Sequence, residues 1–476
     1  MVVQTELFID GVWTEGNGRS ADVQNPATGK TIARIPFAGP THLAAAAAAA
    51  HAGFARWRAT PAVERSNLLR RAADLLRERR ETIAGDLTME QGKPKAEALV
   101  EIGVSADLLD WFADEGRRVN GQILPPRVAG GEQKVLREPI GPVAAFTPWN
   151  FPVSQAVRKL GPALATGCSV VVKPPENTPL SVSGLIRCFE DAGLPAGVLN
   201  MVMGVPAEIS DYLIPHPSIR KISFTGSVPV GKRLAAMAGA HMKPATMELG
   251  GHAATILLAD ADLDKAIPLL VGHKFRNAGQ VCVSPTRFLV ERPIYETVVE
   301  EFARRASELR VGDGSRPDTQ MGPLISVARC DAVDTLVREA INKGARLVTG
   351  GARIGNEGNF YEPTVLADVT SEMRIMNEEP FGPVALFKPF DAMDELLTEA
   401  NRLPFGLAAY AFGKDAGRLD RIAADIESGM LTINHLGLAV PEAHFGGIKD
   451  SGYGSEGGAA ALDAYLVAKF IARVSA

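Results

Sequence analysis

From about residue 140 onward, short runs of β-branched residues alternate with helical stretches, roughly every 20–25 residues. The apolar runs are PVAAFTP, SVVVKPPE, VLNMVMG, IRKISFTGS and ATMELGG, and the helical stretches between them include SGLIRCFEDAGLP and PVGKRLAAMAG. A strand, a helix and a strand at this spacing predict βαβ units, which build a parallel sheet. Because such sheets bind ligands at the carboxyl ends of their strands, the residues that follow each run are the first candidates for function.

The second half of the chain repeats this alternation with its own elements. The segments RFLV and ARLVTGG are predicted strands, and helices are predicted around residues 295–309 and 391–401. A chain of 476 residues is long enough for roughly three domain-sized units. We therefore predict an α/β protein with two doubly wound parallel-sheet units, the first formed by residues 1–118 and 139–248 and the second by residues 249–450.

Three segments lie outside this alternation. THLAAAAAAAHAGFARW predicts a helix that Thr41 caps, since alanine is the strongest helix former. GQILPPRVAGGEQKVLREP holds turn signals between short extended pieces, as in a protruding hairpin, and AYLVAKFIARV predicts a strand that needs a partner. We predict that residues 119–138 and 455–476 form a small β arm that pairs with another subunit. The protein would then be a homo-oligomer, either a dimer or a tetramer.

The charge balance excludes several kinds of partner. Lys and Arg number 50 against 55 Asp and Glu, which gives a formal net charge of −5, and the basic residues are scattered along the chain. We therefore expect no nucleic-acid partner and no attraction to an anionic membrane. No apolar run approaches the ~18 residues of a membrane span, and the N-terminus lacks a basic-then-apolar signal pattern. These features predict a soluble, cytoplasmic protein.

The cysteines and histidines show no structural or metal-binding pattern. Four cysteines without CxxC spacing do not form a disulfide framework in so long a chain. The eight histidines include no HxxxH or HExxH pair, so we expect no metal site. Cys168, Cys188 and Cys330 lie in apolar or helical stretches, and we interpret them as inert.

Two glycine-rich segments are candidates for a phosphate-binding loop. The pattern G-x-G-x-x-G occurs at Gly452, Gly454 and Gly457, but no clear strand precedes it, so we interpret it as a loop that needs positive φ angles. FTGSVPVG is the better candidate, because Gly226 and Ser227 join a predicted strand to a predicted helix. Backbone N–H groups and the helix dipole at such a junction point at an anion such as a pyrophosphate.

Two charged residues follow the buried strand VVVK. Lys173 ends this strand, and Glu176 comes three residues later, after two prolines. A carboxylate at that place can accept hydrogen bonds from both hydroxyls of an adenine ribose, while the lysine offers donors to the same sugar. The alternative interpretation is a solvated ion pair.

One cysteine differs from the other three. In FRNAGQVCVSPTR, Cys282 comes directly after a helix-breaking Ala-Gly-Gln turn. On this pattern alone, the thiol could be a small buried hydrophobe, a redox partner, a metal ligand or a nucleophile. Three further polar residues stand at comparable positions: Asn150 in TPWNFP, Glu248 in MELGG and Glu379 in EEPFGPV. The four side chains need a common explanation.

TPWNFP, FTGS, MELGG, FRNAGQVC and EEPFGPV, in this order, resemble the aldehyde dehydrogenase superfamily of nicotinamide-dependent enzymes. The likeness runs from FIDGVW near residue 8 to FGGIKDSGYG near residue 445, and the step of 34 residues from Glu248 to Cys282 (282 minus 248) is similar to that of the family. The resemblance implies that the first unit is a Rossmann-like NAD-binding domain and the second a catalytic domain. It also implies oxidation of an aldehyde to a carboxylic acid through a cysteine thiohemiacetal and a thioester.

The resemblance implies a role for individual residues. Cys282 matches the nucleophile, Asn150 together with the Cys282 backbone N–H matches the oxyanion donors, and Glu248 matches the base that activates water. The presence of Glu248 favours this hydrolytic reaction over transfer to coenzyme A. Lys159 is similar to a lysine that supports the site from behind. The residues implied in cofactor binding are Trp149, Lys173, Glu176, Gly226, Ser227, Leu249, Glu379 and Phe381.

The cofactor and the substrate can be narrowed further. Glu176 would repel a 2′-phosphate, which favours NAD, with NADP as the alternative. KFRNAGQVC and WNFPVSQAVRKLGPALATGC are most similar to the succinate-semialdehyde dehydrogenase branch, and Arg158 and Arg276 match its carboxylate-binding arginines. Since guanidinium groups bind carboxylates bidentately, we predict a carboxylate-bearing semialdehyde such as succinate semialdehyde.

Three residues depart from that branch. Ala439 stands where a serine is common, His444 where a proline is usual, and Ser284 replaces a second cysteine that forms a disulfide with the nucleophile in some members. Loss of the serine hydroxyl leaves a longer semialdehyde, or an uncharged aliphatic or aromatic aldehyde, as a competing substrate. Two different kinds of protein also compete with an active dehydrogenase: a cysteine hydrolase with His252 or His273 as base, and an inactive binding protein with the same fold.

Overall fold

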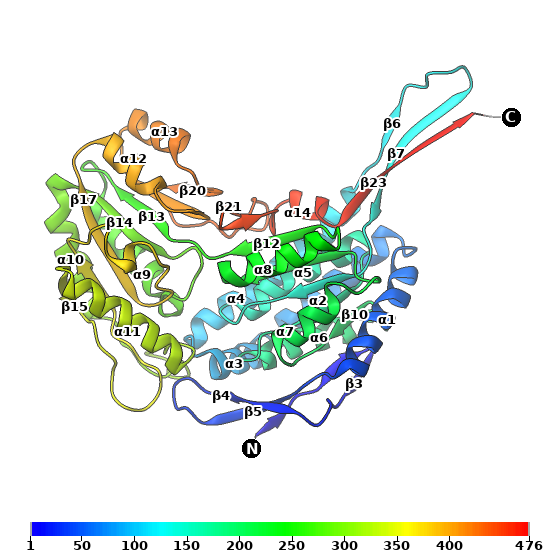
Figure 1. Ribbon diagram of the computed structural model, residues 1–476, viewed down its shortest axis with the longest axis horizontal. Coiled ribbons are helices and arrows are strands. Elements are labelled where there is room, and N and C mark those ends of the chain that lie inside the picture. The colour runs from blue at the N-terminus through cyan, green and yellow to red at the C-terminus, as the bar shows by residue number, and fades with distance from the viewer. Residues whose placement is uncertain (1, 475–476) are drawn as a thin grey trace.

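Two large β-sheets, one in each half of the chain, organise the fold (Figure 1). The computed structural model describes residues 2–474. Residue 1 and residues 475–476, which the sequence placed in the first unit and in the arm, lie outside the described residues. Within the described range both sheets are mainly parallel. The predicted α/β class with two parallel-sheet units is confirmed.

The strand order of the first sheet creates a switch point. In sheet order its strands are β22 (Gly452–Tyr453), β12 (Ala245–Leu249), β11 (Lys221–Gly226), β8 (Val143–Phe146), β9 (Val170–Lys173), β10 (Leu199–Met201), β2 (Leu7–Ile9) and β3 (Val12–Thr14). The chain moves outward from β8 through β9 to β10, and then returns to add β11 and β12 on the other side of β8. Open α/β sheets bind ligands where the strand order reverses, which here is the carboxyl edge of β8 and β11.

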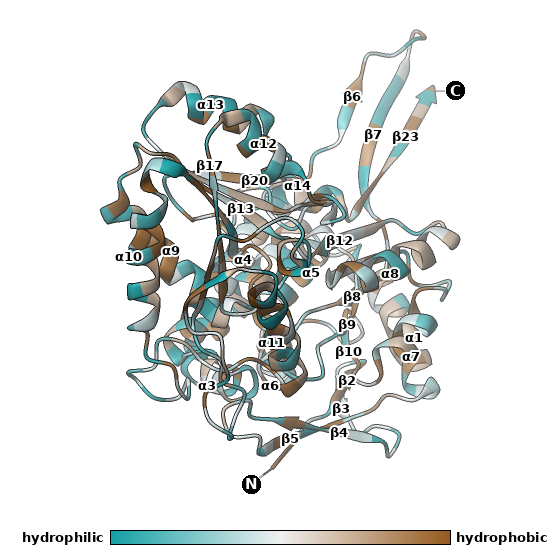
Figure 2. Ribbon diagram, turned by 60° about the vertical axis from the view of Figure 1, so that its left-hand side comes forward, coloured by the Kyte–Doolittle hydropathy of each residue, from teal (hydrophilic) through white to brown (hydrophobic). Residues whose placement is uncertain are grey.

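Helices cover both faces of this sheet, as Figure 2 shows. One face carries α1 (Pro40–Trp57), α7 (Pro206–Leu213) and α8 (Val228–Ala240). The other carries α5 (Pro152–Thr166) and α6 (Pro179–Asp191), with α2 (Ala62–Glu78), α3 (Arg80–Gln91) and α4 (Lys95–Glu115) packed against them. Every residue of β8 and β9 is buried, as expected for central strands covered on both faces.

The second sheet lies in the other half of the molecule. In sheet order its strands are β15 (Arg346–Thr349), β16 (Thr364–Ala367), β17 (Val384–Phe390), β14 (Pro285–Glu291), β13 (Ala253–Leu257), β19 (Ala408–Phe412) and β20 (Met430–Ile433). Only β15 pairs antiparallel among these described strands. The chain crosses from the first sheet to this one between the end of β12 and the start of β13, next to the predicted boundary at residues 248 and 249.

Two hydrophobic clusters sandwich the second sheet. Successive residues of β13 alternate between them, with Leu257 in the larger cluster and Ile256 in the smaller one. The larger cluster includes residues of α9 (Leu263–Phe275), α10 (Tyr295–Ser307) and α11 (Val327–Asn342), and the smaller one includes residues of α12 (Met393–Asn401) and α13 (Ala416–Asp425). The short 3₁₀ helices are η1 (Gly116–Arg118), η2 (Arg276–Gly279), η3 (Arg292–Ile294) and η4 (Arg374–Met376).

A three-stranded arm projects from the body of the molecule (Figure 1). It consists of the hairpin β6 (Gln122–Leu124) and β7 (Gly131–Pro139) and of β23 (Leu466–Val474), which pairs antiparallel with β7 along its whole length. The C-terminal strand thus finds its first partner within its own chain. Residues 455–465 of the predicted arm segment pack on the first unit instead, where Ala461, Leu462 and Tyr465 join the core around α14 (Ala460–Asp463).

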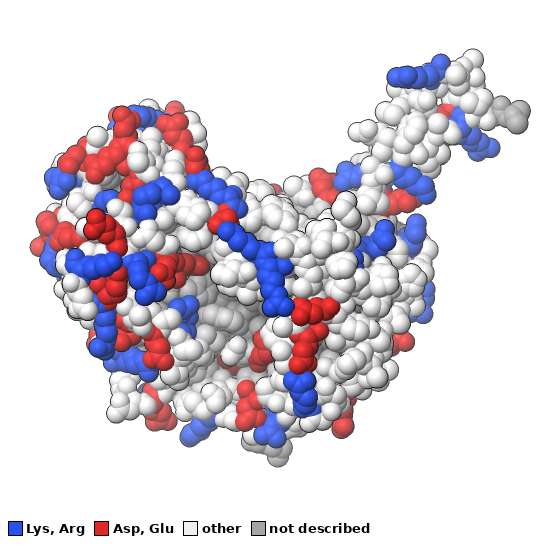
Figure 3. Space-filling view, viewed as in Figure 1, with Lys and Arg blue, Asp and Glu red and all other residues white. Residues whose placement is uncertain are grey.

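Two smaller sheets complete the described chain. They are the sheet of β1 (Val3–Gln4), β5 (Thr31–Pro36) and β4 (Ser20–Gln24), and the pair of β18 (Phe405–Gly406) and β21 (Ile448–Lys449). No helix among residues 2–474 is both long and apolar enough to span a membrane. Figure 3 shows acidic and basic residues intermixed over the visible face, with no broad patch of one sign.

Two local predictions can be compared with the backbone. Thr41 was expected to cap α1, but Gly39 is the N-cap residue and Pro40 occupies the first turn. The prediction was wrong because proline already has the φ angle of a helix, so that the helix starts at Pro40, two residues earlier than a Thr41 cap would place it. In the segment predicted as a loop, Gly452 and Gly454 have positive φ angles of 114° and 99°, whereas Gly457 does not, and Gly452 lies in the short strand β22.

The aromatic contacts between β14, β17 and α10 give a stability prediction. Phe288 is fully buried, with its ring centre 4.6 Å from that of Phe387 and 5.0 Å from that of Phe302. We expect Phe288→Ala to reduce the free energy of unfolding by about 3–5 kcal/mol, because it leaves a cavity in this cluster. Thermal unfolding followed by circular dichroism measures the change. The control Val12→Ala, at an exposed position, should shift the midpoint little, and equal midpoints for both variants would contradict the prediction.

Candidate active site

Asn150 lies in the loop between β8 and α5, at the switch point of the first sheet. Its side-chain amide donates a hydrogen bond to the backbone carbonyl of Gln280 at 3.1 Å. Its own backbone carbonyl accepts a hydrogen bond from the side-chain amide of Asn277 at 3.0 Å. Both partners belong to the segment that carries Cys282. The end of a first-unit strand is therefore bonded directly to the cysteine loop of the second unit.

A left-handed turn shapes the cysteine loop. Asn277, Ala278 and Gly279 have φ angles of 49°, 52° and 71°. A side chain at Gly279 would not fit, since its Cβ would lie 2.1 Å from the carbonyl oxygen of Gly382. Ala278 has no such freedom and adopts this conformation at a cost of about 1–2 kcal/mol. Backbone strain of this kind is common at functional sites. Here the left-handed turn reverses the direction of the chain just before Cys282.

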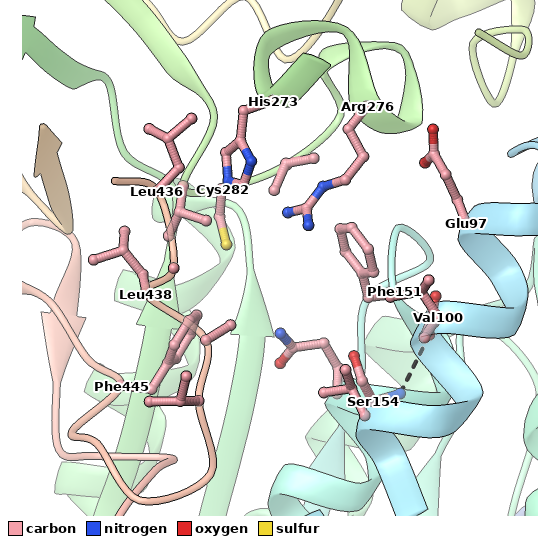
Figure 4. A pocket seen from close by; sticks show the side chains of 18 of the residues that line it. Glu97, Val100, Phe151, Ser154, His273, Arg276, Cys282, Leu436, Leu438 and Phe445 are labelled. Atoms are coloured by element: carbon pink, nitrogen blue, oxygen red, sulfur yellow. Dashed lines mark hydrogen bonds between the residues drawn. The ribbon is translucent and has the colours of Figure 1, made fainter. Parts of the chain in front are cut away.

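The Cys282 thiol opens onto a cavity of about 470 Å³ between the two units. Figure 4 shows the Cys282 sulfur and the Arg276 guanidinium pointing into this cavity. Most of the wall is apolar, and it includes Val100, Val104, Phe151, Leu436, Leu438 and Phe445. Ala439 also lines the cavity, whereas His444 does not. A small molecule bound there would meet apolar surface everywhere except at a few polar groups.

The two predicted arginines both line this cavity, but their surroundings differ. Arg158 is buried, donates to the backbone carbonyl of Glu456 at 2.9 Å and lies 4.3 Å from the ring centre of Phe445. Burial lowers the pKa of Arg158, while the charges of Glu456, Glu248 and Cys282 raise it. This dependence places Arg158 close to the reactive groups.

Arg276 is less constrained. It is only partly buried, and its guanidinium carbon lies 5.5 Å from the ring centre of Phe151. Its buried Nε has no hydrogen-bond partner among the described residues. The guanidinium end of Arg276 points into the apolar cavity, where a positive charge with planar donors is suited to bind an anion.

The environment of Cys282 disfavours the thiolate. Burial raises the pKa of the thiol to about 12, and the carboxylates of Glu379 and Glu248 act in the same direction. Arg158 and the backbone N–H of Val283 lower it, but by less. The thiol is therefore protonated at neutral pH and needs a base to become nucleophilic.

Glu248, next to the last residue of β12, is a candidate for that base, because its charge acts on Cys282. It is only 2% exposed, and neither carboxylate oxygen has a hydrogen-bond partner among the described residues. Burial raises its pKa well above the usual range, and Glu456 adds to this effect, while Lys159 and Arg158 oppose it. A buried carboxylate without a partner is costly, so its presence indicates a function rather than a contribution to stability.

Lys159 acts on Glu248 through its charge but does not line the cavity. Its ammonium group forms a buried ion pair with Glu456 and donates to the hydroxyl of Thr225 at 2.6 Å. Glu456 also accepts a hydrogen bond from Ser223 at 3.1 Å. Lys159 of α5 and Ser223 of β11 thus hold the carboxylate of Glu456, which comes from the loop after β22.

The edge of the first sheet could hold a dinucleotide. Ser227 is the N-cap residue of α8, and its side chain makes no capping hydrogen bond, which leaves the hydroxyl and the first N–H groups of the helix for a phosphate. Gly226 ends β11 just before it. At the end of β9, Lys173 is buried and ion-paired with Glu176, whose side chain is 34% exposed. These donor and acceptor groups fit a pyrophosphate and an adenine ribose.

Four further residues predicted to bind the cofactor lie where the two units meet. The rings of Trp149 and Phe381 make an edge-to-face contact at 5.5 Å. Glu379 lies against Gly250, where a Cβ would be 2.3 Å from its Oε2 atom, and burial raises the pKa of Glu379 to about 8. Leu249 is buried at the end of β12, next to Gly250. These residues close the gap between the first-sheet edge and the cysteine loop.

The structure therefore brings the predicted residues together in two groups. Cys282, Arg158 and Arg276 share the cavity, and Asn150 and Glu248 are connected to Cys282 by the loop hydrogen bond and by charge. The residues predicted to bind the cofactor follow strands of the first sheet or lie at the junction of the units. Ser284, the position that departs from its branch, accepts a hydrogen bond from the buried Lys274 at 3.3 Å.

The two histidines considered as bases differ in environment. Both ring nitrogens of His252 are engaged, with the Thr286 hydroxyl at 2.7 Å and the Ile375 carbonyl at 2.9 Å, so its role is structural. His273 lines the cavity, and burial together with the charge of Arg276 lowers its pKa to about 3. No hydrogen bond joins His273 to Cys282 within the described chain, which weighs against a cysteine–histidine pair.

The sequence interpretation missed several residues of the site. Glu456 was read only as part of the glycine pattern SGYGSEGG, although an acidic residue between small residues could have indicated a buried carboxylate. Lys93 and Glu101 form a fully buried ion pair beside Asn150, in a helical region where charged residues are usually solvated. No local pattern distinguishes such residues, because their partners are distant in the sequence.

A sheet edge suited to a dinucleotide, next to a cavity that holds a buried thiol, is typical of an oxidoreductase that binds its substrate covalently. Comparison with known families specifies this class. The sequence matches the aldehyde dehydrogenase family from residue 13 to residue 471, and the chain belongs to that family. The resemblance found in the sequence motifs is thereby confirmed, and the protein is an aldehyde dehydrogenase.

Individual relatives share nearly the whole chain. A 4-(hydroxymethyl)benzenesulfonate dehydrogenase of Comamonas testosteroni is 46% identical over 98% of this chain and 97% of its own length. A 3-sulfolactaldehyde dehydrogenase of Pseudomonas putida is 44% identical over 99% of this chain and 97% of its own. The crystal structure of a succinate-semialdehyde dehydrogenase from Burkholderia pseudomallei is 42% identical and superposes with a TM-score of 0.97, covering 99% of this chain and 98% of that one.

The raised pKa of Cys282 predicts how the thiol reacts with an alkylating agent. Because the pKa lies at about 12, the thiolate fraction should increase about tenfold per pH unit between pH 7 and pH 10 without levelling off. The rate of Cys282 labelling by iodoacetamide, followed by mass spectrometry without cofactor, measures this fraction.

Cys282→Ala serves as the control, since it removes the labelled site and leaves the three buried cysteines. We expect this variant to bind NAD normally. A labelling rate with a midpoint near about pH 8.5 and a plateau above it, as for an unperturbed thiol, would contradict the assigned environment.

Proposed function

We propose that the protein oxidises an aldehyde with an anionic group at its far end to the corresponding carboxylic acid, with NAD as the hydride acceptor. The observation that carries this proposal is the guanidinium of Arg276, which points into the apolar cavity of Cys282 (Figure 4). The chemistry of the relatives supports it, because each is named for a compound that bears a sulfonate or a carboxylate. Succinate semialdehyde is a small substrate of this class.

Cys282 attacks the carbonyl carbon of the aldehyde in the first step. The thiol proton passes to a base, for which Glu248 is the candidate, and from there to solvent. The sulfur then forms a bond to carbon, the carbonyl π bond breaks, and the carbonyl oxygen becomes an oxyanion. The amide of Asn150 and the backbone N–H of Cys282 are the proposed donors to this oxyanion, and one such donor is typically worth a factor of about 10²–10³ in kcat. Asn150 already directs its amide at the cysteine loop, where it bonds to Gln280.

When bound, NAD would supply the acceptor for the hydride of the adduct, and the oxidised carbon would remain bonded to Cys282 as a thioester. Glu248 then takes a proton from water, which attacks the thioester and releases the acid and the thiol. The raised pKa of Glu248 suits this role, since a buried carboxylate is a stronger base than a solvated one. Glu379 and Trp149 are proposed to hold the nicotinamide half of the cofactor near the cysteine loop.

Glu176 supports NAD over NADP. It stands three residues after the end of β9 and is partly exposed, beside the ammonium group of Lys173. A carboxylate there accepts the ribose hydroxyls but repels a 2′-phosphate. Gly226 and Ser227 are proposed to bind the pyrophosphate at the start of α8, and Leu249 and Phe381 to border the nicotinamide end.

The two arginines are proposed to have different roles in the site. Arg158 is bonded to the Glu456 carbonyl and interacts with Glu248 and Cys282, so its charge acts mainly on the reactive groups. Arg276 then remains to bind the carboxylate or sulfonate. The apolar wall between Arg276 and Cys282 favours a substrate with a hydrocarbon or aromatic middle.

Arg276→Ala tests the anion-binding role. We expect KM to rise about 10- to 100-fold for succinate semialdehyde and for 4-sulfobenzaldehyde, because a charge-assisted hydrogen bond is lost. KM for butanal and benzaldehyde should change by less than about 3-fold. NADH absorbance in steady-state assays measures both parameters, with NAD and NADP compared in parallel.

Arg276→Lys is the matched control for this experiment. It retains the charge but not the planar fork, so its KM for the anionic aldehydes should lie between those of the wild type and Arg276→Ala. Equal changes for charged and uncharged aldehydes would discard the anion-binding role. Failure of the wild type to reduce NAD or NADP with any aldehyde would overturn the proposed oxidation.

We further infer that the arm joins copies of this chain into a homo-oligomer. Four apolar side chains on the strands of the arm are exposed to between 42% and 90%: Ile123, Val467, Phe470 and Val474. Exposed strands with such side chains are rarely left uncovered, because they attract further strands. The arm is a single three-stranded sheet with no second layer to cover these side chains, so a second subunit is the proposed partner.

The double variant Ile123→Asp/Phe470→Asp tests this inference. We expect a lower molar mass in solution than for the wild type, because two charges would have to be buried in the interface. Light scattering coupled to gel filtration measures the mass, and circular dichroism verifies the fold. Val63→Asp, at an exposed apolar position on α2, should keep the mass of the wild type. Identical masses for all three proteins would overturn the role of the arm.

A further inference from the structure

A buried lysine outside the catalytic group touches the backbone of Asn150. Lys93 lies between α3 and α4 and is 1% exposed. Its ammonium group donates to the carboxylate of Glu101 at 2.6 Å and to the backbone carbonyl of Asn150 at 2.7 Å. It also lies 3.8 Å from the ring centre of Phe151. All of its short contacts therefore converge on the loop that follows β8 and on one carboxylate.

Glu101 connects this lysine to the start of α5. One oxygen of its carboxylate binds Lys93, and the other accepts hydrogen bonds from the backbone N–H groups of Val153 at 3.0 Å and Ser154 at 3.2 Å. These N–H groups belong to the first turn of a helix, where they have no partner within the helix. Glu101 thereby fixes the beginning of the helix that carries Arg158 and Lys159.

The same helix face also reaches the cysteine loop. Glu97, one turn before Glu101 on α4, accepts a hydrogen bond from the backbone N–H of Asn277 at 2.9 Å. Asn277 in turn donates from its side chain to the Asn150 carbonyl. The Asn150 carbonyl is therefore held by two donors, one from the segment before α4 and one from the cysteine loop.

Stability alone does not explain this arrangement. A fully buried ion pair gains little over two apolar side chains of the same size, because both charges must leave water. What an apolar pair could not provide is a donor for the Asn150 carbonyl and an acceptor for the first turn of α5. Both are directional contacts, and both act on the position of the loop between β8 and α5.

We propose that Lys93 and Glu101 are a positioning pair, which holds the Asn150 amide in place beside Cys282 through the backbone of residues 150–154. The inference rests on the proposed role of Asn150 as an oxyanion donor and extends that role to two residues that do not touch the reacting atoms. A shift of the Asn150 carbonyl would turn the side-chain amide away from the oxyanion, and the loss should appear in kcat rather than in KM.

Lys93→Met, with a side chain of similar length and no donor, is the first test variant. We expect kcat to fall about 10- to 100-fold and KM for the aldehyde to change by less than about 3-fold. NAD affinity, measured by quenching of intrinsic fluorescence, and the iodoacetamide labelling of Cys282 should stay at wild-type values. Lys95→Met, which removes an exposed neighbouring lysine, is the matched control and should keep the wild-type kcat.

The double variant Lys93→Met/Glu101→Gln replaces both members of the ion pair, so that no buried carboxylate is left without a partner. It is used for the test if the single variant does not fold. The decisive measurement places these changes in an Asn150→Ala background. If the pair acts through Asn150, the added changes should lower the residual kcat by less than about 2-fold, because the group they position is absent.

Independent losses that multiply in that background would overturn the inference, and so would a lowered melting temperature with unchanged kcat. These results would leave the proposed role of Asn150 intact. Full kcat in Asn150→Ala alone would instead overturn the oxyanion role and the positioning role together.

Discussion

The hydrogen bond from the Asn150 amide to the Gln280 carbonyl is the contact on which the arrangement of the site depends. Each sheet fixes the residues at its own strand ends, but neither sheet determines the distance between the two edges. Asn150 comes from the first sheet and Gln280 from the loop that carries Cys282, so this bond relates the two edges directly. It is buried, where a hydrogen bond is stronger and its loss costs more than at the surface. The left-handed turn at Asn277 and Ala278 presents the Gln280 carbonyl to Asn150, and the strain of that turn is offset by contacts of this kind.

Burial of charge is the second constraint on the site. Arg158, Lys159, Glu248 and Glu456 are all at most 3% exposed and lie within one region of the first unit. Removing such groups from water costs free energy. For Arg158, Lys159 and Glu456, an ion pair or a hydrogen bond offsets part of this desolvation free energy. Glu248 alone has neither among the described residues, and its pKa is raised accordingly. The energetically least satisfied group is therefore the one assigned to proton transfer, in agreement with the general tendency of functional sites to store such costs.

How much of this could be read from the sequence depends on how far apart the interacting residues lie. The strands VAAF and VVVK, the junction at Gly226 and Ser227 and the loop of Cys282 were predicted because each has its cause within a few residues. Thr41 was a wrong prediction even at short range, because Pro40 occupies the first turn and Gly39 is the N-cap residue. The pair of Lys93 and Glu101 could not be predicted, because nothing near them in the sequence shows that they are buried, and Glu456 was missed although small residues flank it. Their partners are up to 297 positions away, and only the packing of the helices on the sheet brings them together.

This difference also explains why the reaction is easier to recognise than the substrate. The groups assigned to chemistry follow β-strands or tight turns, whose geometry local sequence patterns describe well. The cavity in front of them is lined instead by α4, by the first turns of α5 and by the loop from Leu436 to Phe445. Side chains on these helices and loops can change size and charge without moving a strand end. A change such as serine to alanine at Ala439 therefore alters what the cavity accepts while Cys282, Asn150 and Glu248 keep their places. Selection for a new aldehyde can therefore change the cavity-lining side chains of the helices and the loop, while the residues at the strand ends that are assigned to oxidation stay the same.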